Sequence, residues 1–156
     1  MRRLLLAMDQ FDSGQVALTF TAELANTVGA DVTVLHIRER SIHPRVLPLE
    51  SLSDAQLLVD EAVFCLRLAG IGVEGRVRSG REDHVAKCIV YESAQSQCDT
   101  IVLGSRRLRG IERVSGRGVK ERVVRFSLLP VVVAPATPIN RVHRPYAFDS
   151  PSFNSP

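Results

Sequence analysis

Blocks of apolar and polar residues alternate along the chain, and they predict strands and helices in turn. Residues 3–9 form a short apolar run that ends at an aspartate, which is typical of a parallel strand buried on both faces. In residues 15–30, apolar positions recur every fourth residue from Val16 to Val28. That spacing predicts a helix with one apolar face, and Gly29 stands where such a helix would end.

The same alternation continues to residue 135. Ser53 and Gly70 bound the clearest helix, with Ser53 as the expected N-cap residue. Residues 73–79 alternate in polarity, which indicates a strand at a sheet edge, whereas residues 38–50 carry two prolines and predict an irregular connection. The other predicted strands are 31–37, 100–105 and 130–135, and the other predicted helices are 82–97 and 118–128.

Strands that alternate with helices predict an α/β fold, with a parallel sheet and right-handed crossovers. We expect a single domain in residues 1–136. Residues 137–156 hold four of the eight prolines, several serines and no apolar period, so they predict a disordered tail. Aromatic residues within this tail would also suit a docking peptide; they are Tyr146, Phe148 and Phe153.

The composition indicates the class of protein and the cellular compartment. With 45% apolar and 24% charged residues, the 156-residue chain resembles a globular protein, and no apolar run reaches the roughly 18–20 residues that span a bilayer. The apolar run at the N-terminus stops at Asp9, which is too short for a signal peptide, so we expect a cytoplasmic protein with no membrane partner. Three cysteines without paired spacing suit a reducing compartment, and four scattered histidines do not predict a metal site. Among the cysteines, Cys98 stands in a polar turn and is the expected reactive thiol.

The net charge of +3 is concentrated in one segment. Arg106–Arg125 contains eight basic and two acidic residues, about +6, so the rest of the chain carries about −3. Such a segment could hold an anionic ligand or an acidic partner.

Ligands of doubly wound sheets bind beyond the carboxyl ends of the strands, where the strand order reverses. In this chain Asp9–Ser13, Ile37–Arg38 and Gly104–Gly118 follow predicted strands and would meet there. The interpretation of Asp9 stays open, because it could contact a ligand or cap the following turn. His36 is expected to be a hydrogen-bonded core histidine.

Over residues 2–135 the chain resembles the universal stress protein family. The resemblance is carried by "RLLLAMDQFDSGQVAL", by "VTVLHI" and by "DTIVLGSRRLRGIERVSGRGVKERVVRFSLLPVVVAP". It implies a five-stranded sheet of order 3-2-1-4-5 with helices on both faces. It also implies a homodimer formed through the final strand, at Val131–Ala134.

Members of that family that bind ATP carry a loop of the form Gly-x-x-Gly, nine residues, then Gly-Ser or Gly-Thr. Gly104 matches the first glycine, but Arg107, Arg117 and Gly118 replace the second glycine, the third glycine and the hydroxyl residue. Two other positions match: the resemblance implies that Asp9 lies near the adenine and ribose, and that the backbone of Ile37 meets the adenine edge.

The replaced glycines weaken the case for ATP. A non-glycine residue in left-handed geometry costs about 1–2 kcal/mol, so two such positions could lower affinity by roughly one to three decades. Arginine also forms good bidentate contacts with phosphate, which could compensate.

Three functions therefore stay open from the sequence. The first is a non-catalytic, dimeric stress-response regulator with weak or no ATP binding, for which no residue is placed as a general base. The second is a nucleotide-binding stress protein in which Arg107 and Arg117 contact the phosphates, with slow ATP hydrolysis still open. The third is a basic module that binds nucleic acid or an acidic protein through Arg106–Arg125.

Overall fold

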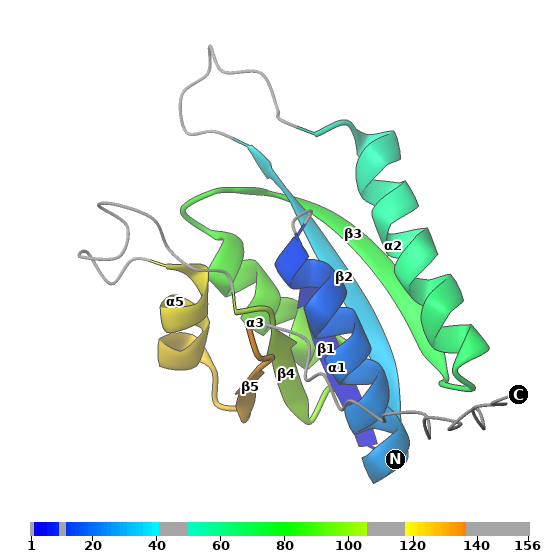
Figure 1. Cartoon of the computed structure of the whole chain (residues 1–156). Coiled ribbons are helices and arrows are strands. Elements are labelled where there is room, and N and C mark those ends of the chain that lie inside the picture. The colour runs from blue at the N-terminus through cyan, green and yellow to red at the C-terminus, as the bar shows by residue number, and fades with distance from the viewer. Residues whose placement is uncertain (1, 10–11, 41–49, 106–117, 137–156) are drawn as a thin grey trace, which may run out of the picture.

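The computed structural model describes residues 2–9, 12–40, 50–105 and 118–136. They form a five-stranded parallel sheet in the order β3-β2-β1-β4-β5, with helices on both faces (Figure 1). The strands are β1 (Arg2–Met8), β2 (Ala30–Arg40), β3 (Val73–Arg81), β4 (Thr100–Leu103) and β5 (Val131–Val133). The helices are α1 (Asp12–Val28), α2 (Leu52–Leu68), α3 (Val85–Gln95) and α5 (Val119–Phe126). The predicted fold class and strand order are confirmed.

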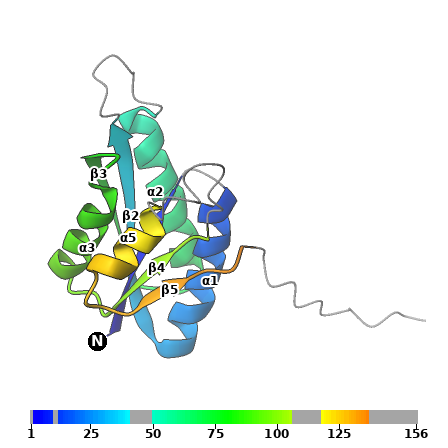
Figure 2. The ribbon, with the colours of Figure 1, turned by 90° about the vertical axis from the view of Figure 1, so that its left-hand side faces the viewer.

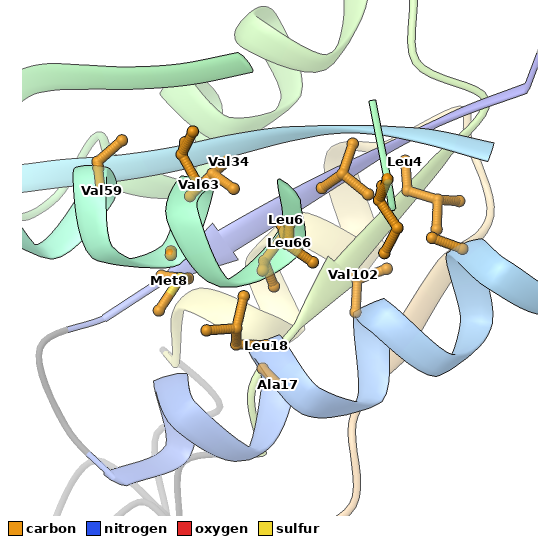
Figure 3. Close-up of a cluster of buried hydrophobic side chains, with 14 of the residues drawn as sticks. Leu4, Leu6, Met8, Ala17, Leu18, Val34, Val59, Val63, Leu66 and Val102 are labelled. Atoms are coloured by element: carbon orange, nitrogen blue, oxygen red, sulfur yellow. The ribbon is translucent and has the colours of Figure 1, made fainter. Parts of the chain in front are cut away.

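Two layers of helices enclose the sheet. Helices α1 and α2 cover one face, and α3 and α5 cover the other (Figures 1 and 2). Successive residues of a strand point to opposite faces, so β1 contributes Leu4 and Leu6 to the first core (Figure 3). It contributes Leu5 to the second core. Burial on both faces explains the apolar run Leu4–Met8, which makes up β1 after its two arginines.

Glycines end the first two helices as predicted. Gly29 has φ +64° and Gly70 has φ +77°, a left-handed geometry that glycine adopts without a steric penalty. Gly75 of β3 is required for packing and not for its backbone angle, because a Cβ atom there would lie 2.5 Å from a Val59 methyl group of α2. The lack of a side chain lets α2 pack closely on β3.

Two predicted helix starts are wrong. The N-cap of α2 is Ser51 and not Ser53, because Ser51 and Asp54 form a capping box in which each side chain bonds the backbone N–H of the other. Helix α3 starts at Val85 rather than at residue 82, since residues 82–84 form a turn closed by a 2.9 Å bond from His84 N–H to the Arg81 carbonyl. The second strand also extends to Arg40; residues 41–49, predicted as an irregular connection, lie outside the described residues.

Candidate functional site

The strands β1, β2 and β4 bring three of the predicted site residues to one edge of the sheet. Met8 pairs with His36, and Ala7 pairs with Leu103, so the residues that follow Met8, His36 and Leu103 are neighbours. Two of them lie just past the ends of β1 and β4, and one lies within β2, which continues to Arg40. These are Asp9, Ile37 and Gly104. Together with Arg38 and Ser105 we call them the switch-point region, because the strand order reverses between β1 and β4.

Asp9 lies against the first turn of α1. A Cβ atom on Gly14 would be 2.5 Å from the Asp9 carbonyl oxygen and 3.3 Å from its carboxylate oxygen Oδ1. The carboxylate is therefore close to the positive end of the α1 dipole, which stabilises a negative charge. Asp9 is half-buried. This position supports a role in fixing the turn and leaves one side of the residue open to solvent.

His36 is buried beside Ile37 and is bonded at both ring nitrogens, as predicted. Its Nδ1 lies 2.9 Å from the Met8 carbonyl oxygen, and its Nε2 lies 2.7 Å from a carboxylate oxygen of Glu50. Because a carbonyl oxygen only accepts, Nδ1 donates to Met8, and Nε2 is in contact with the Glu50 carboxylate. The contact holds Glu50, which precedes the N-cap residue of α2, against β2 beside Ile37. Because both ring nitrogens of His36 are bonded, this residue is not available as a general base.

Two buried polar atoms of this region have no hydrogen-bond partner within the described part of the chain. They are Nε of Arg38, which is a donor, and Oγ of Ser105, which can donate or accept. Buried groups of this kind are usually satisfied by water, an ion or a ligand. From the sequence, Arg38 and Ser105 are placed only within the stretches Ile37–Arg38 and Gly104–Gly118, since the burial of a single atom depends on the packing of neighbouring elements.

Gly118 is buried and serves as the N-cap of α5. Its φ of −59° and ψ of 150° are open to any residue, and no side chain caps the helix. The backbone geometry at this position therefore does not require glycine. Arg107 and Arg117 lie outside the described residues.

The described part of the basic segment is largely engaged with the protein itself. Lys120 lies 3.7 Å from Glu121, and the Arg122 guanidinium donates to the Asp83 carbonyl. The one aromatic ring of α5, Phe126, has the Lys87 ammonium 6.0 Å from its centre. This arrangement offers little to nucleic-acid bases.

The two edge strands differ in chemistry. Strand β3 places charged side chains in ion pairs, among them Arg76 and Arg78 with the buried Glu92 at 3.4 and 2.7 Å. Strand β5 is three valines, with Val133 39% exposed and Leu128 nearby in the chain fully exposed. Charged edges resist pairing with another sheet, whereas an uncovered apolar edge favours it.

A separate hollow of about 490 Å³ lies at the opposite ends of the strands. Arg2, Leu4, Leu24, Val28, Asp99, Thr100 and Val132 line it. It contains none of the predicted site residues, so it is not the switch-point region.

The predicted reactivity of Cys98 is wrong. The thiol is buried among α3 and β4 residues, and burial raises its pKa above the usual value. Gln97, immediately before Cys98, has a left-handed φ of 51°. Of the other cysteines, Cys65 of α2 is exposed. Among the described residues, no cluster of histidine, cysteine or acidic residues could hold a metal ion, and no helix has the length and apolar character to cross a membrane.

Comparisons with known proteins agree with this architecture. The model of the Universal stress protein family matches residues 1–135. A protein of that family from Burkholderia pseudomallei has a similar structure, with TM-score 0.69 and 21% identity over 86% of this chain and 96% of that one. The universal stress protein from Archaeoglobus fulgidus in complex with dAMP has TM-score 0.63 and 24% identity, over 86% and 98% of the two chains. A universal stress protein in complex with cAMP has TM-score 0.68 and 18% identity, over 87% and 98%. No curated protein matches by sequence.

Proposed function

Because the chain belongs to the universal stress protein family, we propose that it is a non-catalytic, dimeric regulatory protein of the stress response with weak or no ATP binding. The observation that carries this proposal is the composition of the loop after β4. Arginines stand at residues 107 and 117 where ATP-binding relatives have glycines, and Gly118 lacks the hydroxyl that would meet a phosphate. The remainder of the nucleotide site keeps its residue types at Asp9, Ile37 and Gly104.

The hydrogen bonds of His36 support the non-catalytic part of the proposal. Hydrolysis of a phosphate bond needs a group that orients or deprotonates water. Of the titratable groups at the described carboxyl edge, His36 is held by Met8 and Glu50, and Asp9 lies against the α1 turn. His36 therefore has no unbonded ring nitrogen with which to accept a proton from an attacking water molecule.

The assembly part of the proposal follows from the sheet edges. The homodimer forms through β5 at Val131–Ala134, where an apolar edge would otherwise face water. The charged β3 edge remains at the outside of such an assembly.

The loop assignment is tested by restoring the family pattern. The variant Arg107→Gly/Arg117→Gly/Gly118→Ser recreates both glycines and the hydroxyl, and the φ of −59° at Gly118 admits serine without strain. We expect calorimetric titration with magnesium ATP to show binding by this variant and none by the unaltered protein. Gly110→Ala, which alters the loop away from the replaced positions, serves as a control and should show no heat of ATP binding. A variant that binds no better than the unaltered protein would show that the arginines are not what prevents ATP binding.

A second function is favoured by the unpaired polar atoms. Arg38 Nε and Ser105 Oγ lie at the same edge as Asp9, and they could bind a nucleotide whose phosphates are held by Arg107 and Arg117. In that case Arg107→Ala and Arg117→Ala would each weaken nucleotide binding by about tenfold or more, since a charge-assisted contact contributes about 1.5–3 kcal/mol. A basic module for nucleic acid would instead lose affinity steeply with salt and would not need Asp9.

A further inference from the structure

The two helices on one face of the sheet present different surfaces to solvent. The exposed positions of α1 are polar: Gln15, Thr19, Glu23, Asn26 and Thr27. Those of α2 include Leu57, Phe64 and Leu68, which are 58%, 62% and 73% exposed. Their spacing of seven and four residues places the three side chains on one line along the helix. We call them the α2 stripe.

No described element covers the α2 stripe, and α2 forms the outer surface of its layer (Figure 1). Apolar side chains that gather on an exposed face mark interaction surfaces, whereas single ones do not. The inner face of α2 already packs on the sheet through Val59, Val63 and Leu66 (Figure 3). The stripe is therefore additional apolar surface that the core does not use.

Three exposed acidic residues and one exposed basic residue, Arg67, border the stripe, so its surroundings carry a net negative charge. Glu61 lies within it, one turn from Leu57 and Phe64, and Asp54 and Asp60 are exposed on the same helix. Two copies of α2 packed face to face would bring these carboxylates together, which disfavours a second copy of the helix as occupant. The chemistry that fits is aromatic and basic.

The C-terminal segment of this chain has that chemistry. Residues 139–148 read "INRVHRPYAF", with Arg141 and Arg144 just before Tyr146 and Phe148. Ala134, at the end of β5, is buried in the same core as α1 and α2, so the described chain ends on their side of the sheet. The ten residues from Ala136 to Tyr146 span up to about 33 Å. Phe64 is roughly 20 Å away across two packed helices and about 18 Å down α2 from its first residue, which makes about 27 Å in a straight line.

We propose that residues 139–148 dock on the α2 stripe of their own chain, with Tyr146 and Phe148 against Phe64 and Leu68. Arg141 and Arg144 lie toward Asp60 and Glu61. The docked segment covers the apolar surface of α2 and crosses the outer side of α1.

A single tryptophan tests this proposal in the full chain. The protein has no tryptophan, so Tyr146→Trp provides the sole emitter, and Tyr91→Trp gives an exposed reference because Tyr91 is 61% exposed. We expect emission from position 146 to be blue-shifted from the reference and several-fold less quenched by acrylamide. Phe64→Ser should return both values to those of the reference, whereas Leu128→Ser, a change at a fully exposed apolar residue outside α2, should not. Emission from position 146 that matches the reference, or shielding that survives Phe64→Ser, would overturn the proposal.

A cross-link identifies the occupant. Cys65 is exposed on α2 next to Phe64, so Ala147→Cys can form a disulfide with it when glutathione disulfide is the oxidant. We expect a bond within one chain, detected by mass and by mobility under non-reducing conditions, which Cys65→Ser abolishes. Bonds found only between chains would show that the tail docks on a second copy, and no bond at all would contradict docking near Cys65.

Discussion

Replacing Glu50 by alanine is expected to destabilise the fold through His36. The imidazole is 3% exposed and the Glu50 side chain 9% exposed, so neither can be rehydrated without local opening. Alanine would leave the buried Nε2 without a partner. Such an orphaned nitrogen costs about 1–3 kcal/mol if the imidazole is neutral, and breaking a buried ion pair costs about 3–5 kcal/mol. We therefore expect a loss of about 3 kcal/mol.

Glutamine at the same position separates the hydrogen bond from the charge. Its amide can donate to Nε2 of a neutral imidazole, so Glu50→Gln should lose only about 1 kcal/mol. Glu82→Ala, at an exposed position, serves as the control and should change stability by less than about 0.5 kcal/mol. Urea unfolding followed by circular dichroism gives these free energies, and thermal unfolding should show Glu50→Ala about 6–12 °C below the unaltered protein.

The reasoning would be refuted if Glu50→Ala were as stable as Glu50→Gln. It would also fail if a double-mutant cycle with His36→Gln gave a coupling energy below about 0.5 kcal/mol, because residues in one hydrogen-bonded pair are strongly coupled.

Three other predictions address packing, assembly and the thiols. Gly75→Ala should cost about 1–3 kcal/mol in urea unfolding, because its Cβ atom would lie 2.5 Å from a valine methyl group of α2; an unchanged stability would show that α2 shifts freely. Val133→Glu should convert a dimer to a monomer in sedimentation analysis, whereas Ser79→Glu on the β3 edge should not; equal behaviour of the two would contradict assembly through β5. Cys65 should react with a thiol reagent in the folded protein and Cys98 only after unfolding. The folded-state pKa of Cys98 is raised, so the contribution of this thiol to stability is complete below the ordinary thiol pKa of 9.0 and is lost as pH rises above it. Cys98→Ala should remove this fall in stability. An unaltered protein whose stability does not fall above that pH would contradict the prediction.

The sheet could be predicted from sequence because its signals are local. The apolar run of β1 and the positive φ angles of Gly29 and Gly70 depend on few neighbours, and each agrees with the structure. The start of α2 was harder, because Ser51 and Ser53 are both good N-cap residues. The reciprocal bond with Asp54 decides between them.

The candidate site was predictable only in part, because its side chains come from separate elements. The register of β1 with β2 and β4 follows from topology, and it places Asp9, Ile37 and Gly104 together. The bond between His36 and Glu50 joins residues on either side of a connection whose path no local pattern indicates. Cys98 likewise follows a left-handed turn at Gln97, a residue with no special preference for that geometry.

The central proposal is that Arg107, Arg117 and Gly118 leave this chain with weak or no binding of ATP. The most direct measurement is calorimetric titration of magnesium ATP into the unaltered protein at moderate salt, beside the Asp9→Ala variant. We expect no measurable heat of binding with either protein at micromolar to sub-millimolar ATP. Micromolar binding that Asp9→Ala abolishes would contradict it, and would show that the arginines have replaced the glycines as the phosphate contacts.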